Sequence, residues 1–209
     1  MKKLLILVMS LMLAIGLTAC GSTVGDIDLE AGQSAIYIHK DGIVSYAVAE
    51  TFDKDYYNED DLEKKIQSEL SDYNASDKAS VNDAIAIDDF DVSGDVATLV
   101  LEFATDYDFL GYMKSYNKVA ADQFYVGSIA DNSKCKVTGD FVSPDGKTTV
   151  KGKDISKMSD AYIIVVNEEY KVQIDGEVLY TSTNCKTDKD GIITTSKDEM
   201  SYVVYNYTD

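Results

Sequence analysis

The acidic stretch FDKDYYNEDDLEKKI, residues 52–66, holds six of the chain's 37 Asp and Glu residues within fifteen positions. Clustered carboxylate oxygens are the ligands that hard cations such as Ca²⁺ prefer, so the stretch could be a metal site. The same residue types also begin helices, because Asn58 is a preferred N-cap residue and the helix dipole favours acids in the first turn. We therefore expect a strand-to-helix junction here, which leaves Asp53 and Tyr57 without a structural role.

Two other acidic stretches could gather oxygen ligands. Around Asp190-Gly191, an EF-hand template would place Lys186 and Lys197 at the first and last ligand positions, and two cations cannot serve there. The residues DDFD at 88–91, together with Asp95, could bind calcium at one turn, although a solvent-exposed acidic hairpin has the same composition. A calcium-stabilised surface domain stays as an alternative, and we predict no particular metal ligand.

Nucleophilic catalysis would have to use His39, which is the only histidine of the chain. A histidine at the end of a hairpin more often faces solvent. The strings at 115–118 and 133–136 have the Ser-x-x-Lys spacing of serine β-lactamases, but the companion motifs Ser-Asp-Asn and Lys-Thr-Gly are missing. The sequence also has no glycine-rich phosphate loop, and one histidine with two distant cysteines does not make a zinc site. We predict no catalytic residue and no cofactor.

Sugar chemistry is harder to exclude from composition. Glycoside hydrolysis needs only two carboxylates, a requirement that 37 acids satisfy trivially. Tyrosine can stack on sugar rings, and the chain has 15 tyrosines and no tryptophan. A carboxylate-dependent extracytoplasmic hydrolase acting on envelope or environmental sugars is therefore the alternative from the enzyme class.

The N-terminus has the features of an export signal. Lys2 and Lys3 precede an apolar run at 4–16, which is shorter than the about 20 residues of a membrane-spanning helix. The run ends in Leu-Thr-Ala-Cys-Gly at 17–21, which resembles the lipobox of bacterial lipoproteins. The resemblance implies transfer of a diacylglyceryl group to Cys20 and cleavage before it. We therefore expect a signal peptide at 1–19 and a protein held by lipid on the outer face of the cell membrane.

The charge of the mature chain argues against nucleic acid as a partner. Every basic residue is lysine, and removal of Lys2 and Lys3 leaves 17 lysines against 37 acids, a formal charge of −20. Nucleic-acid binding needs a positive footprint, usually with arginine. A strongly acidic surface attracts cations, so a cationic protein is one candidate partner and a carbohydrate is another.

Two cysteines remain if Cys20 carries lipid. An exported protein can join Cys135 and Cys185 in a disulfide, which would contribute roughly 4 kcal/mol in the chain-entropy model. The alternative is a pair of buried free thiols.

The first half of the chain predicts two strand–strand–helix units. Residues 20–33 are small, polar and acidic, and predict a flexible tether. Strands are predicted at 35–38, 44–52, 84–87 and 96–103, and helices up to Asn74 and over 106–116. The junction Phe-Asp-Lys-Asp-Tyr at 52–56 matches Phe-Ala-Thr-Asp-Tyr at 103–107, which suggests that one degenerate unit is used twice.

From about Gln123 the helical period disappears. Short apolar runs separated by turn signals predict a small β sandwich or barrel. The predicted strands are 123–129, 135–142, 148–151, 162–166, 171–174, 178–183, 191–195 and 202–207. The expected fold is α+β, with an N-terminal lobe at 34–122 in which the two units lie on an antiparallel sheet, and a mainly β lobe at 123–209.

Two longer stretches resemble a known group of proteins. KDGIVSYAVAETFDKDYYNEDDLEKKIQSELSDYN and VQIDGEVLYTSTN are similar to patterns in membrane lipoproteins of clostridial-type Gram-positive bacteria. The resemblance implies a location and a fold, and no chemistry. The sequence as a whole favours an extracytoplasmic lipoprotein that acts as a non-enzymatic binding or interaction module at the cell envelope.

Overall fold

The computed structural model describes residues 23–116, 123–131 and 136–208. The protein is a mixed α and β protein dominated by sheet, with 40% strand and 17% helix. Two sheets of six and seven strands account for most of it, and a two-stranded hairpin precedes them.

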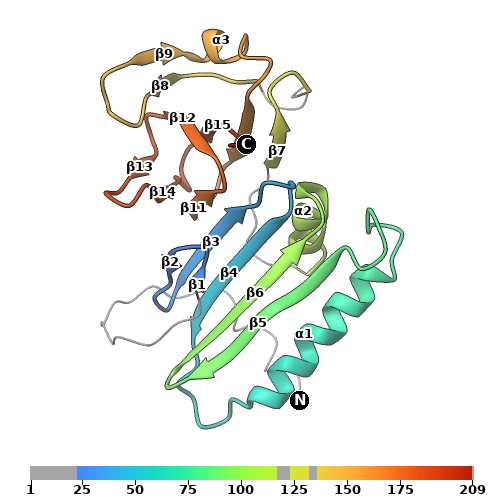
Figure 1. Ribbon diagram of the computed structural model, residues 1–209. Helices are drawn as coiled ribbons and strands as arrows, with labels where there is room; N and C mark the ends of the chain where they lie inside the picture. The colour runs from blue at the N-terminus through green and yellow to red at the C-terminus, as the bar shows by residue number, and fades with distance from the viewer. Residues whose placement is uncertain (1–22, 117–122, 132–135, 209) are drawn as a thin grey trace.

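The seven-stranded sheet combines strands from both halves of the chain (Figure 1). Its order is β13-β14-β11-β3-β4-β6-β5. The strands are β3 (Gln33–Ile38), β4 (Val44–Thr51), β5 (Ile85–Ser93), β6 (Val96–Phe103), β11 (Lys171–Ile174), β13 (Lys186–Thr187) and β14 (Ile193–Thr194). The four strands from the N-terminal half pair antiparallel, as expected. The sheet as a whole is mixed, because β11 from the second half of the chain pairs with β3 in parallel.

Two helices cover one face of this sheet: α1 (Glu59–Asn74) and α2 (Asp106–Ser115). Asn58 caps α1 by accepting a hydrogen bond from the backbone N of Asp61 at 2.9 Å, as the sequence predicts. Ile66, Leu70 and Tyr73 of α1 are buried, in agreement with their helical spacing.

The helices also contact each other. The rings of Tyr73 on α1 and Tyr112 on α2 meet with their centroids 5.9 Å apart. A Cβ atom at Gly111 would lie 2.5 Å from the Tyr73 hydroxyl, so a larger residue there would require the Tyr73 ring to shift.

The opposite face of the sheet is covered by a hairpin of β1 (Thr23–Val24) and β2 (Ile27–Asp28). Val24, Ile27 and Leu29 are buried against small side chains of the sheet, which are Ala35, Ala47 and Ala49. Residues 23–33 therefore differ from the flexible tether expected for 20–33. Three apolar residues among polar ones show no helical or strand spacing in the sequence. In the structure they pack together on the three alanines.

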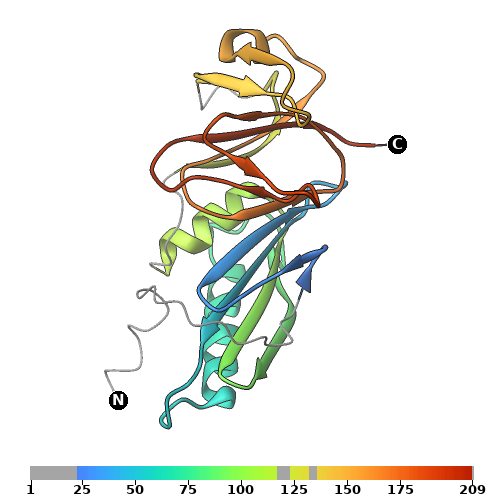
Figure 2. The same ribbon diagram turned by 90° about the vertical axis from the view of Figure 1, so that its left-hand side faces the viewer.

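The six-stranded sheet is antiparallel, with the order β7-β10-β15-β12-β8-β9 (Figure 2). Its strands are β7 (Phe124–Ser128), β8 (Asp140–Val142), β9 (Thr149–Lys151), β10 (Tyr162–Val166), β12 (Glu177–Ser182) and β15 (Ser201–Asn206). A short helix, α3 (Gly152–Ile155), follows β9.

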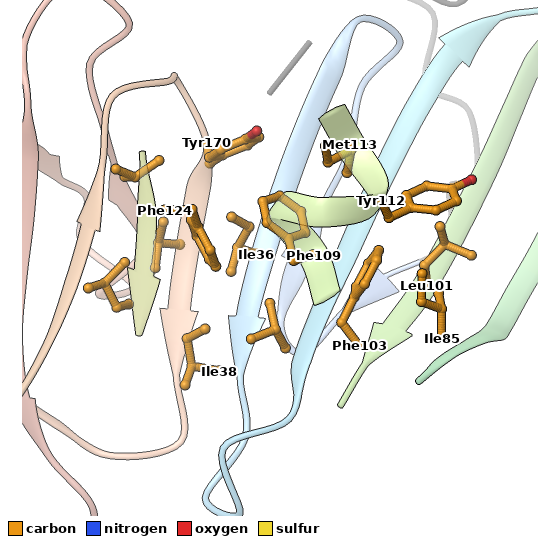
Figure 3. Packing of buried hydrophobic residues seen from close by; sticks show 14 of the residues in the cluster. Ile36, Ile38, Ile85, Leu101, Phe103, Phe109, Tyr112, Met113, Phe124 and Tyr170 are labelled. Carbon is orange, nitrogen blue, oxygen red and sulfur yellow. The ribbon is translucent and has the colours of Figure 1, made fainter. Parts of the chain in front are cut away.

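One hydrophobic core joins the two sheets (Figure 3). Phe109 of α2 lies at its centre, with its ring 4.5 Å from that of Phe124 in the second sheet and 5.3 Å from that of Phe103 in the first. Because α2 contributes to both contacts, its position is tied to both sheets.

Candidate functional site

A surface hollow lies between the C-terminal half of α1 and the beginning of β5. Its volume is about 670 Å³, and it is shallow and largely open to solvent. Its lining residues are Gln67, Leu70, Ser71, Asn74, Ala75, Asn82, Asp83, Ile85, Ala86 and Ile87. We call this hollow, with the adjoining edge of β5, the α1–β5 groove.

A side-chain amide joins the two walls of the groove. Nδ2 of Asn74 donates to the carbonyl oxygen of Ile85 at 2.8 Å, and the backbone N of Ile85 donates to Oδ1 of Asn74 at 3.0 Å. Backbone groups buried without partners are costly, so this double hydrogen bond fixes the end of α1 against the start of β5.

Strand β5 is the edge of the seven-stranded sheet and has nine residues. The other edge strands of the described chain are shorter, with two residues each in β1, β2 and β13, five in β7 and three in β9. A β-bulge lies between Ile87 and Asp89, and Asp88, Asp89 and Asp91 are exposed. Charges and bulges on an edge strand are devices that prevent sheet-to-sheet aggregation.

The loop between α1 and β5, at one end of the groove, is held in place by the buried carboxylate of Asp108. Asp108 is fully buried, and Oδ1 accepts from the backbone N of Ser80 at 2.8 Å. Its Oδ2 accepts from the hydroxyls of Ser80 and Thr105, each at 2.5 Å. The pKa of Tyr73 is raised to about 12, mainly by burial and secondly by the nearby charge of Asp108. These bonds position the segment that leads to Asn82 and Asp83.

Asp83 itself has an unusual backbone. Its φ of 53° is in the left-handed region, which aspartate tolerates better than most residues. Of the described residues that line the hollow itself, Asp83 is the only acid, and none is basic. A hydrolase of the kind considered from composition would need a second carboxylate at this place.

The second hollow, of about 450 Å³, is lined by His39, Lys40, Asp41 and Asp175. Nε2 of His39 forms a hydrogen bond of 2.6 Å with the hydroxyl of Ser45. Ser45 is only 2% exposed, so its hydroxyl cannot reach a substrate in this arrangement. The pair therefore ties β4 to the end of β3, and the ring of His39 packs edge-on against Tyr37.

The two residues that the sequence left without a role lie at the junction before α1. Asp53 accepts from Nζ of Lys54 at 2.5 Å, and this bond lowers the pKa of the exposed carboxyl. The ring of Tyr57 packs between Phe52 and Tyr56, with both centroid distances 4.9 Å. Both residues have local partners at the junction, and neither lines the groove.

The acidic stretch around Asp190 also has local partners. Oδ1 of Asp188 accepts from the backbone N of Asp190 and of Ile192, which closes a turn. Within the described ranges, no three His, Cys, Asp or Glu side chains lie close enough together to hold a metal ion. Nor is any helix in those ranges long and apolar enough to cross a membrane.

The predicted modification sites fall mainly outside the described residues. Cys20 and Cys135 both lie there, so lipidation and the pairing of Cys135 with Cys185 stay predictions. Sγ of Cys185 lies 3.4 Å from the hydroxyl of Ser182, and burial raises the pKa of this thiol.

Comparison with known proteins adds no relative. No family model matches the chain, and neither a curated protein nor a solved structure matches it. The geometry of the groove is therefore the basis on which a function can be argued.

Sequence reasoning missed the groove because its parts are local features of other kinds. The sequence predicts Asn74 as the end of a helix and residues 88–91 as part of an acidic turn. The signal that could have found it is the length of β5: the acids at 88, 89 and 91 interrupt the apolar alternation, and the strand continues through them to Ser93.

Proposed function

We propose that this protein is a lipoprotein of the cell envelope, anchored through Cys20 on the outer face of the membrane, and that its folded part is a non-enzymatic binding module for a cationic partner. One observation carries the binding role. The longest edge strand of the described chain is exposed, acidic and adjacent to an open hollow without a basic lining residue.

The charge of the chain supports a cationic protein over other partners. With a formal charge of −20 in the mature chain, nucleic acid and anionic lipid head groups are repelled. Attachment to the membrane then depends on the acyl chains at Cys20, since more than one chain is needed for stable anchoring.

We also propose that the N-terminal part, residues 34–122, contains the strand–strand–helix unit twice, before a mainly β part at 123–209. Asn58 and Thr105 cap the two helices in the same way, each accepting from a backbone N three residues later. The tyrosines at the matching junctions, Tyr56 and Tyr107, are 64% and 58% exposed. The similarity to clostridial-type lipoproteins agrees with this organisation.

Cell fractionation tests the anchoring. The wild-type protein is expected in the membrane fraction and to be removed by protease added to intact cells, whereas Cys20→Ala is expected in the medium or the soluble fraction. Cys185→Ala serves as the matched control and should stay with the membrane. If Cys20→Ala also fractionates with membranes, the lipoprotein proposal is wrong.

A further inference from the structure

We propose that the α1–β5 groove binds a short, lysine- or arginine-rich extended segment of another protein as an additional strand on β5, paired at Ile87. This inference rests on the proposed function and names the chemistry of its partner. Strand addition at an exposed sheet edge is a general mode of peptide recognition, in which main-chain hydrogen bonds give affinity and side-chain contacts give selectivity.

The hydrogen-bonding pattern of β5 shows which backbone groups face outward. The backbone N of Ala104, next to β6, donates to the carbonyl of Ala84 at 2.8 Å, so Ala84 faces β6. In an antiparallel pair, residues whose backbone N–H and C=O point toward the partner strand alternate with residues whose groups point away from it. The backbone groups of Ile85 and Ile87 therefore point away from β6. The side chain of Asn74 forms hydrogen bonds with the backbone N and O of Ile85. In the described part of the chain, no side chain does so with the backbone N and O of Ile87.

Asn74 indicates the type of partner that this edge accepts. Its amide supplies one donor and one acceptor to a single residue, which is what a neighbouring strand would supply. An added strand would continue this pairing from Ile85 to Ile87. The bulge before Asp89 then ends the regular register, so the segment that fits is short.

The groove gives the incoming side chains two different surroundings. Leu70, Ala86 and Ile87 provide apolar surface, while Gln67 and Ser71 of α1 provide polar groups on the facing wall. Successive residues of a strand point to opposite faces. Alternating side chains of the segment can therefore contact the apolar surface and the exposed acids.

Charge selects the occupant among extended segments. Asp83, Asp88 and Asp89 are exposed in or next to the groove, so they favour lysine or arginine side chains in a bound segment. A second copy of this chain would bring the same acids opposite one another, which is destabilising across paired strands. The acids thus prevent self-pairing and favour a basic segment.

Binding of a synthetic peptide tests the inference. The full, lipidated protein in detergent micelles is titrated into a labelled Lys-Val-Lys-Val-Lys-Val-Lys peptide with blocked ends, and anisotropy is recorded. A second peptide has the same sequence with N-methyl groups on alternate amides, which keeps the charge but removes donors. The unmodified peptide is expected to bind about tenfold or more tightly than the methylated one, a difference of about 1.4 kcal/mol. Equal binding of both peptides would overturn the inference, because charge alone would then explain it.

Variants of the protein locate the site. Asp88→Lys is expected to weaken binding about tenfold, whereas Asp190→Lys, the same charge change at an exposed turn away from the groove, should change it less than about twofold. Amide exchange at Ile87 should slow when the peptide is bound. An equal loss in both variants would contradict binding at the groove.

A third probe separates this inference from the proposed function. Cytochrome c is a folded basic protein that offers no free extended segment. If it binds the chain in a salt-sensitive manner and the peptide does not, strand addition at β5 is wrong and a cationic partner stays supported. If neither probe binds, both proposals fail.

Discussion

The side chain of Asn74 pairs with both backbone groups of Ile85, with hydrogen bonds of 2.8 and 3.0 Å. The last residue of α1 therefore supplies to the edge strand β5 the hydrogen-bond donor and acceptor that a neighbouring strand would supply. This relationship closes one end of the α1–β5 groove and sets the position at which a further strand could begin.

Replacement of Asn74 tests how much this pairing contributes to the fold. We expect Asn74→Ala to lower the free energy of unfolding by about 1–3 kcal/mol, because two polar backbone groups of Ile85 lose their partners. Urea unfolding measures the change, and faster amide exchange at Ile85 would localise it. Asn82→Ala is the matched control, since Asn82 is exposed and lines the same hollow. Similar losses in both variants would contradict a specific role for Asn74.

The N-cap of α1 gives a second prediction. Asn58→Ala removes the acceptor of the Asp61 backbone N, and we expect a loss of about 1 kcal/mol in thermal or urea unfolding. Asn58→Asp keeps an acceptor at this position and should unfold much like the wild type. If the aspartate variant were as unstable as the alanine variant, the capping role would be wrong.

The buried carboxylate of Asp108 gives a third prediction. Three donors, two on Ser80 and one on Thr105, bind this carboxylate. In Asp108→Asn, an NH₂ group would face donors in the same space, and we expect a loss of about 2–3 kcal/mol in urea unfolding.

Asp77→Asn is the control for this change, because Asp77 is exposed in the same connecting segment. Changes at exposed positions are usually within about 0.5 kcal/mol. A stability of Asp108→Asn equal to that of this control would show that the carboxylate does not hold the loop.

Glu50 gives a prediction about pH. Burial raises the pKa of this half-buried carboxyl on β4, so folding favours its protonated form relative to the unfolded chain. The cost is absent below the unfolded pKa, grows as the pH rises between the unfolded and the folded pKa, and is fully present above the folded pKa. Glu50→Gln should therefore be more stable than the wild type at pH 7.

The same variant has an internal control in acid. At about pH 3, where the glutamate is protonated in both states, the two melting temperatures should converge. Thermal melts at the two pH values measure this. A stabilisation that persists unchanged in acid would show that packing, and not ionisation, is the cause.

Local sequence patterns were enough to predict most helices and strands. The alternation at 44–52 and 96–103 appears as β4 and β6, and the spacing of Leu62, Ile66, Leu70 and Tyr73 appears as the buried side of α1. Asn58 could be predicted as a cap because capping joins residues only three positions apart. These features depend on short-range periodicity, which the order of residues states directly.

Tertiary structure alone decided how these elements are combined. The parallel pairing of β11 with β3 and the packing of the first hairpin on the alanines of the sheet join residues that have no local relation. The bond between Ser80 and Asp108 spans 28 positions, and the pair of Asn74 with Ile85 spans 11. The exposed edge of β5 is also a property of the whole sheet, since a strand is an edge only when no other strand lies beside it. The periodic spacing of apolar side chains repeats along each helix or strand, so it can be recognised in the sequence. Which elements pack on or pair with one another depends on burial and hydrogen bonding between distant segments, and only the folded structure brings these segments together.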